Sequence, residues 1–307
     1  MQKKLLIMLF PFALFFLACN SSGEPKDDGV PLVNWGELKR IDFNSEWVEG
    51  RFVDILLPEG YDPNFSYPVI YMQDGQMLFD SSISWNRQSW LMAEVIAELA
   101  RDEDFTPPII VGIHNNGELR FAEYFPAAVI DFVPEEVRDE MLAKLPGQPL
   151  SDEYLRFLVT ELKPFIDENF STRQGPRNTY IVGASMGALI SIYALCEYPA
   201  IFSAAACLST HWLGPEPEDR ILPAAYAEYL KANIPSPMRH RIYFDLGDQG
   251  LDAVYQPFQL QVDSVMMGLG YVFGEDWLTV VLPGEEHNEI SWNRRIGSAL
   301  SFLMRDR

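Results

Sequence analysis

Apolar strand patterns and apolar helix patterns alternate along most of the chain. Polar and apolar side chains alternate over residues 38–47 and 51–57 on either side of a short turn, which predicts an antiparallel hairpin. Apolar runs predict buried strands at residues 67–72, 107–113, 180–182, 204–208, 241–244 and 277–282. Helical spacing of apolar residues predicts helices at 90–99, 152–170, 188–195, 223–232, 255–269 and 290–304. Strands that alternate with helices in this way predict an α/β fold with a mostly parallel sheet and helices on both faces.

One stretch departs from this alternation. Residues 117–150 carry no clean period and include a proline-broken, acidic helical pattern at 133–145, so we expect an insertion there. The chain otherwise contains nothing that resembles a linker or a repeat. A single domain over residues 34–307 is therefore predicted.

The first residues are expected to be a targeting signal. Lys3 and Lys4 precede an apolar run at 5–18 that is too short to span a bilayer. The run ends at Cys19 and resembles a bacterial lipoprotein signal over residues 1–19, in which the cysteine is acylated. Cleavage near Ala18 without lipidation stays open. Residues 20–33 read as a polar tether, which predicts an exported protein of the outer membrane or periplasm that contacts the membrane only through this anchor.

Charge narrows the range of partners. The chain has 44 acidic and 23 basic residues and a formal charge of -21, which argues against nucleic acid as a partner because phosphate backbones would be repelled. No group of histidines, cysteines and acids has metal-ligand spacing, so no metal and no other cofactor is expected. Cys196 and Cys207 are expected to pack as small buried side chains, with a disulfide as the alternative.

A candidate nucleophile lies between an apolar strand and an apolar helix. The stretch from Gly183 to Gly187 reads Gly-Ala-Ser-Met-Gly, which predicts a tight strand-to-helix turn with Ser185 at its tip. Glycines are needed there because the backbone passes close to itself. The first N–H of the helix, at Met186, is a candidate donor to an oxyanion. The competing interpretation is a glycine-rich packing turn.

A second oxyanion donor is expected after the strand at 67–72. The loop that follows contains Asp74, Gly75 and Gln76, and we expect the N–H of Gly75 or Gln76 to serve as the donor. The alternative is a simple turn in which Asp74 binds its own backbone.

The order of residues along the chain selects a base and a set of acids. A serine nucleophile on this fold is followed by the acid and then by the histidine. His287 follows the last predicted strand, whereas the other three histidines precede the acid loop. Asp245, Asp248 and Asp252 compete for the role of acid. Asp245 is still at the strand end and is expected to be structural, whereas Asp248 and Asp252 both lie where the loop can reach His287.

Several short segments together resemble a known family. They are residues 71–80, 123–126, 161–166, 182–187, 243–247, 251–252, 283–287 and 291–292. The resemblance is to the putative esterase family of α/β-hydrolases, which includes esterase D, enterochelin esterase and the feruloyl and acetylxylan esterases. It covers residues 53–303 and implies an α/β-hydrolase fold without a cofactor. It also implies Ser185 as nucleophile, Asp252 as acid, His287 as base and the Gly75 to Gln76 loop as oxyanion support. Gln73 and Ala188 depart from the family's usual residues, which bears on the fit of the substrate.

These residues predict a serine esterase, and the resemblance implies that it removes acyl groups such as acetyl or feruloyl from carbohydrate. Asp74 and His211 are candidate substrate-binding residues. Trp212 and Trp292, together with Trp85, are candidates for stacking on sugar or aryl rings, although tryptophan also packs in cores. The alternatives are a siderophore esterase, an acyltransferase, and an inactive glycan-binding lipoprotein on the same fold.

Overall fold

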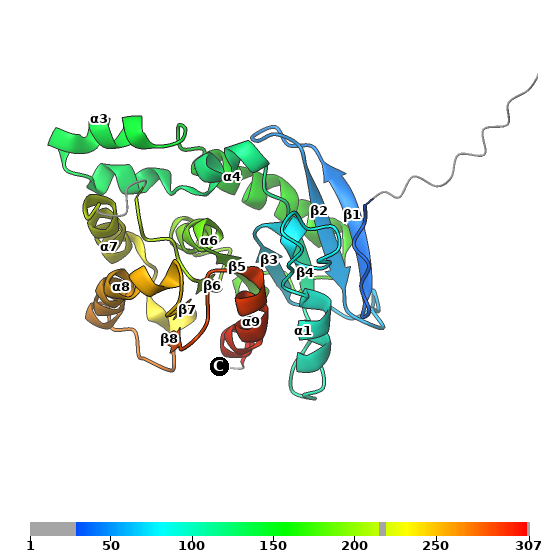
Figure 1. Cartoon of the computed structure of the whole chain (residues 1–307). Coiled ribbons are helices and arrows are strands. Elements are labelled where there is room, and N and C mark those ends of the chain that lie inside the picture. The colour runs from blue at the N-terminus through cyan, green and yellow to red at the C-terminus, as the bar shows by residue number, and fades with distance from the viewer. Residues whose placement is uncertain (1–28, 215–218, 306–307) are drawn as a thin grey trace, which may run out of the picture.

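The computed structural model describes residues 29–214 and 219–305 (Figure 1). The expected signal, the acylated Cys19 and most of the tether therefore lie outside the described residues. Within the described ranges, no helix is both long enough and apolar enough to span a membrane.

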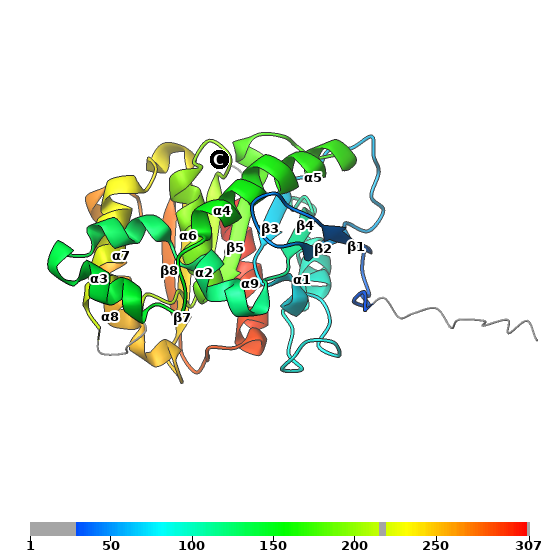
Figure 2. The ribbon, with the colours of Figure 1, turned by 90° about the horizontal axis from the view of Figure 1, so that it is seen from above.

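An eight-stranded sheet forms the centre of the described chain. Its order is β1-β2-β4-β3-β5-β6-β7-β8. The hairpin β1–β2 is antiparallel, β2 also pairs antiparallel with β4, and all other neighbours are parallel. The strands are β1 (Glu37–Phe43), β2 (Arg51–Leu57), β3 (Val69–Met72), β4 (Ile109–Ile113), β5 (Thr179–Ala184), β6 (Ala204–Leu208), β7 (Arg241–Gly247) and β8 (Trp277–Leu282). The hairpin and the mostly parallel sheet are as predicted, and β1–β2 and β7–β8 lie at opposite ends of the sheet (Figure 2).

The strand order changes direction at β3. The chain leaves β3 to build β4 on one side and later returns to build β5 on the other side. Met72 on β3 lies opposite Val182 on β5, so the residues that follow the two strands emerge side by side. Ligands bind in such sheets at the carboxyl ends of the strands around this switch point.

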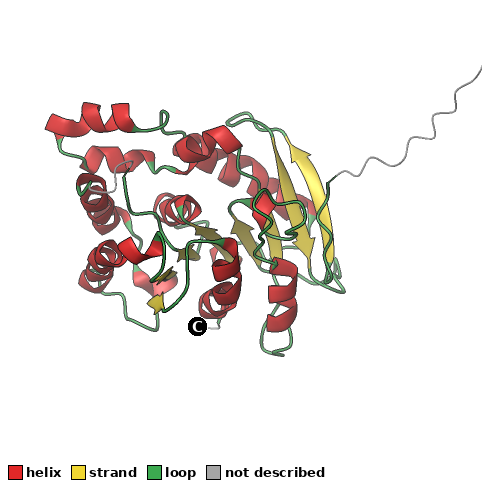
Figure 3. Ribbon diagram, in the orientation of Figure 1, coloured by secondary structure: helices red, strands yellow, loops and turns green. Residues whose placement is uncertain are grey.

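Helices cover both faces of the sheet (Figure 3). On one face, α1 (Met92–Leu99) and α9 (Glu289–Met304) contribute to an apolar cluster with residues from the strands. The larger cluster on the other face includes residues of the remaining long helices. They are α4 (Ser151–Arg156), η4 (Phe157–Leu162), α5 (Lys163–Asn169), α6 (Met186–Glu197), α7 (Ile221–Asn233) and α8 (Gln256–Gly268).

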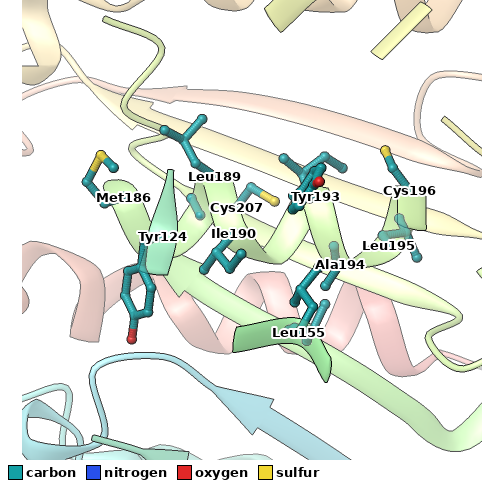
Figure 4. Close-up of a cluster of buried hydrophobic side chains, with 14 of the residues drawn as sticks. Tyr124, Leu155, Met186, Leu189, Ile190, Tyr193, Ala194, Leu195, Cys196 and Cys207 are labelled. Carbon is teal, nitrogen blue, oxygen red and sulfur yellow. The ribbon is translucent and has the colours of Figure 1, made fainter. Parts of the chain in front are cut away.

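Helix α6 is the most deeply buried helix of the fold. Every residue of α6 except Glu197 is buried, as expected for a helix that is apolar all round. Figure 4 shows its side chains packed with Cys207 of β6 and Tyr124. Cys196 and Cys207 are both buried and free, which confirms the packing interpretation.

The predicted helix at 152–170 contains a wide turn. It runs through α4, η4 and α5, and η4 has π geometry. Pro164 lies two residues after the end of η4 and has no N–H to donate to an α-helical partner four residues earlier, so the irregularity lies where the regular hydrogen-bond pattern has to break.

The segment at 117–150 is built from short helices. They are η2 (Gly117–Leu119), α2 (Arg120–Tyr124), η3 (Ala127–Phe132) and α3 (Glu135–Lys144). Helix α2 packs against α4 and α6, and η3 packs against α7. This segment therefore lies next to α6, and α2 reaches Asp74 just after the end of β3.

Candidate active site

Ser185 sits in a strained turn between β5 and α6. Its backbone has φ 58° and ψ -124°, a region that residues other than glycine rarely adopt. A Cβ on Gly183 would lie 2.2 Å from the carbonyl oxygen of Gly187, so the turn closes only with glycine there. A Cβ on Gly187 would lie 3.0 Å from Cβ of Gln73, at the end of the neighbouring strand. The predicted tight turn is present, and Ser185 is partly exposed at its tip.

The loops after β7 and β8 bring an acid and a histidine together. Asp252 opens η7 (Asp252–Val254), and its Oδ1 lies 2.7 Å from Nδ1 of His287. Asp248 is exposed and accepts a hydrogen bond from the backbone N–H of Gly284 at 2.7 Å. Asp245 is buried within β7. Of the three candidate aspartates, Asp252 is the one that contacts the histidine.

A buried network fixes the Asp252 carboxylate from behind. Its Oδ2 accepts hydrogen bonds from Ser209 Oγ at 2.6 Å and from the N–H of Gly247 at 2.7 Å. Burial alone would raise the pKa of Asp252, but the hydrogen bonds from His287, Ser209 and Gly247 together lower it. The acid is therefore ionised at neutral pH and points at the histidine.

Ser209 and Arg295 are the members of this network that the sequence did not suggest. Ser209 has φ 45°, and its Oγ also accepts hydrogen bonds from Trp292 Nε1 at 3.0 Å and from Arg295. The Arg295 guanidinium is buried between two carboxylates, with Nε 3.6 Å from Asp245 and Nη2 3.4 Å from Asp252. Burial raises the pKa of Asp245 to about 7, although Arg295 opposes the shift.

The end of β6 connects the serine to the acid. The Ser185 N–H donates to the carbonyl of Leu208 at 2.9 Å, and the next residue, Ser209, holds Asp252. Among the hydrogen bonds of the described residues, none joins Ser185 to His287. Such contacts in ligand-free hydrolases often tighten only when substrate binds.

Two helix starts offer backbone donors beside the serine. Met186 is the first residue of α6, and the first N–H groups of a helix have no partner within it. The turn η1 (Gly75–Met77) begins after β3, and a Cβ on Gly75 would lie 2.6 Å from the backbone of Gly112. The N–H groups of Gly75 and Gln76 take no part in the backbone hydrogen bonds of the described chain, whereas that of Met77 donates to Asp74. The expected donors thus lie at the ends of β3 and β5.

Asp74 is held by an ion pair beside these donors. Its two oxygens accept from Arg120 Nε at 2.7 Å and Nη2 at 2.8 Å, and Asn115 donates to Oδ1 at 2.6 Å. Burial alone would lower the pKa of Arg120, but the Asp74 carboxylate raises it. The Asp74 side chain thus binds Arg120 and Asn115. Arg120 was not among the predicted site residues.

His211 and Tyr255 contact each other beside His287. His211 Nδ1 lies 2.7 Å from the Tyr255 hydroxyl, and the Tyr255 ring meets the His287 ring edge-on with centroids 5.7 Å apart. Burial, together with the smaller electrostatic effects of His287 and Arg120, lowers the pKa of His211 to about 4. His211 is therefore neutral at neutral pH, and it lies close to both His287 and Arg120.

The prediction that Trp212 and Trp292 bind substrate is wrong. Trp212 is 1% exposed and donates through Nε1 to Gln259, and Trp292 is 7% exposed and donates to Ser209. Their ring faces are packed in the protein, so neither can stack on a ligand. Trp292 instead packs against the His287 ring, with centroids 5.1 Å apart.

The described residues contain no group of three or more histidine, cysteine, aspartate or glutamate side chains placed to hold a metal ion.

Comparison with known proteins places this site in context. A sequence model of the family described as putative esterase matches residues 49–260. The uncharacterized protein YbbA of Bacillus subtilis is 24% identical over 163 residues, which cover 53% of this chain and 57% of that protein. The chain thus spans about half the length of the curated relatives it matches.

Solved structures share the fold at low sequence identity. A ferulic acid esterase superposes with a TM-score of 0.65 at 17% identity, over 89% of this chain and 99% of the other. The enterobactin esterase FES from Shigella flexneri gives a TM-score of 0.61 at 17% identity, over 90% of this chain and 61% of the other.

Proposed function

The chain belongs to the putative esterase family, and on that premise we propose that Ser185, His287 and Asp252 are its catalytic triad. The hydrogen bond between His287 Nδ1 and Asp252 Oδ1 carries the proposal, because it fixes the ring and leaves Nε2 for the serine. Ser185 itself has a strained backbone conformation, which a simple packing turn would not need.

The reaction is acyl transfer from an alcohol to water. Ser185 Oγ attacks the ester carbonyl while His287 Nε2 takes the hydroxyl proton. The carbonyl oxygen becomes an oxyanion that the N–H of Met186 and an N–H of Gly75 or Gln76 stabilise. His287 then gives the proton to the leaving alcohol. Water attacks the acyl-enzyme, again with His287 as base, and releases the acid and Ser185.

The substrate is proposed to be an acyl group on carbohydrate, such as acetyl or feruloyl. The fold that the chain shares with a ferulic acid esterase supports this choice. The strongly acidic chain also favours a neutral polymer over a polyanionic one. The shared fold with the enterobactin esterase FES supports a siderophore ester as the second candidate.

The test compares the purified protein with its Ser185→Ala variant. We expect the wild type to hydrolyse 4-nitrophenyl acetate and the variant to lose at least about 10³-fold in kcat. Ser301→Ala, an exposed serine on α9, is the matched control and should keep full activity. Equal turnover by wild type and Ser185→Ala would refute the proposal. Separate assays then decide between the two substrate classes. Turnover of methyl ferulate or acetylated xylo-oligosaccharide would support the carbohydrate ester, and turnover of ferric enterobactin would support the siderophore ester.

A further inference from the structure

The loop from Asp80 to Leu91 presents an unusual tryptophan. The Trp85 side chain is 81% exposed, and no ring or cation contact covers it among the described residues. Trp47 is 41% exposed, but the Arg156 guanidinium lies over its ring at 4.9 Å. Ile83, two residues before Trp85, is 47% exposed. Single exposed apolar residues are common on protein surfaces, so Trp85 is of interest because of where its loop is attached.

This loop is fixed by its own hydrogen bonds. Ser82 N–H donates to Asp80 Oδ1 at 2.7 Å, and Ser84 Oγ donates to the carbonyl of Ser81 at 3.2 Å. The N–H of Arg87 donates to the carbonyl of Ser84 at 3.2 Å. These hydrogen bonds involve residues on both sides of Trp85 in the sequence, so they fix the backbone conformation at Trp85. The indole is therefore presented to solvent by an ordered turn, which reduces the entropy that a ligand contact would cost.

The same loop is attached to the segment that carries His287. Asn86 Nδ2 donates to Glu289 Oε2 at 2.7 Å, and Glu289 begins α9 two residues after His287. The Trp90 and Trp292 rings lie 5.6 Å apart, and Asn293 donates to the carbonyl of Trp90 at 2.6 Å. Helices α1 and α9 lie side by side in both ribbon views (Figures 1 and 2). Trp85 thus stands on a turn bound to the segment that carries the base.

The attachment of this loop next to His287 indicates one half of the substrate. In the triad mechanism His287 delivers its proton to the leaving alcohol, so the groups that flank the base face the alcohol rather than the acyl chain. On a carbohydrate ester the alcohol is a sugar. The axial C–H face of a pyranose is flat and apolar, and it matches the uncovered face of an indole, whose amphipathic ring suits a partly wet surface.

We propose that Trp85 is a stacking platform for a sugar ring of the carbohydrate that carries the ester. This inference rests on the proposed function, since it assigns the alcohol side of the same site. Asn86, which donates to Glu289, is the polar neighbour of Trp85 in this loop. The net charge of -21 disfavours an anionic membrane as the occupant of this surface.

The experiment measures two substrates on three variants. Trp85→Ala should lower kcat/KM for acetylated xylotetraose about tenfold, mainly through KM, and Trp85→Phe should recover part of that loss. Turnover of 4-nitrophenyl acetate should stay within about twofold in both variants, because that ester has no sugar to stack. Trp47→Ala should match the wild type on both substrates. Equal losses on the two substrates, or no loss on the oligosaccharide, would overturn the proposal.

A binding experiment separates this proposal from the proposed function. Calorimetric titration of unacylated xylohexaose into Ser185→Ala and into Ser185→Ala/Trp85→Ala needs no catalysis. We expect about tenfold weaker binding in the double variant even if no ester is turned over. Equal affinities of the single and double variants would refute the proposed role of Trp85 and leave the esterase proposal intact. Trp85-dependent sedimentation with phosphatidylglycerol vesicles, without any Trp85-dependent sugar binding, would assign the loop to a membrane and also overturn the proposal.

Discussion

The Asp252 carboxylate depends on neighbours from four parts of the chain. One oxygen faces His287, and the other accepts hydrogen bonds from Ser209 and Gly247 with Arg295 nearby. This arrangement explains a lowered pKa in a fully buried acid, since each bond favours the charged form. Asp248 has no comparable surroundings, because it lies in solvent and binds the turn at Gly284.

Replacing each acid by its amide should separate the two candidates. In Asp252→Asn the amide cannot stabilise the imidazolium, so we expect kcat for 4-nitrophenyl acetate to fall by about 10³- to 10⁴-fold. Asp248→Asn should change kcat by less than about threefold. Steady-state kinetics on both variants, with circular dichroism as the folding control, decides the matter. A larger loss in Asp248→Asn than in Asp252→Asn would reassign the acid.

For single residues, the sequence predicted which side chains have a chemical role more reliably than which side chains are buried. The strand-to-helix turn at Ser185 and the loop histidine could be found because short-range glycine spacing and chain order constrain them. Trp212 and Trp292 were misassigned because the burial of an aromatic ring is decided by distant parts of the chain, here Gln259 and Ser209. Arg120 was missed for the same reason, since only the fold brings it to Asp74.

Individual elements followed their local patterns closely, with exceptions that have physical causes. Strands β6 and β8 begin and end as predicted, because apolar runs bounded by polar turns define buried strands. Strand β7 extends to Gly247, beyond its predicted end at Phe244, because pairing with β8 continues there. The wide turn η4 had no signal other than Pro164.

The joint between β5 and α6 should tolerate no side chain at Gly183. An added Cβ would lie 2.2 Å from the Gly187 oxygen, which is backbone and cannot move aside, so Gly183→Ala should destabilise the fold by about 3 kcal/mol or more. Gly268→Ala is the matched control, because no atom lies within 4 Å of the added Cβ and the residue ends α8. That control should change stability by less than about 1 kcal/mol. Urea unfolding of both variants measures the difference, and similar midpoints would contradict this account.

The stability of the whole molecule is expected to depend on pH through one buried acid, Asp245. Asp245 lies between β6 and α9, facing Arg295, with Asp252 and Tyr243 as the other titratable groups near it. Its pKa is about 7 in the folded chain against an ordinary value of 3.8. The folded state therefore binds more protons than the unfolded state between these values, and stability falls as pH rises through that window.

Asp245→Asn should remove this dependence. The unfolding free energy of the variant relative to wild type should increase as pH rises from about 4 to about 7, and it should be constant above about pH 8. Asp131→Asn, at an exposed position, should show no such trend. Urea midpoints at pH 4.5, 6 and 8 give the comparison. A relative stability that is flat, or that decreases with pH, would show that Asp245 is ionised throughout.

The strand order described above also sets when the site comes into existence during synthesis. The serine turn requires β5 paired between β3 and β6, but His287 follows β8, and Trp292 and Arg295, which contact Ser209, arrive only with α9. A ribosome adds roughly 5–20 residues per second, so Ser185 precedes His287 by several seconds. Throughout that interval the nascent chain lacks the proposed proton acceptor of Ser185. Under the proposed triad, docking of the last helix is thus the event that makes the chain reactive.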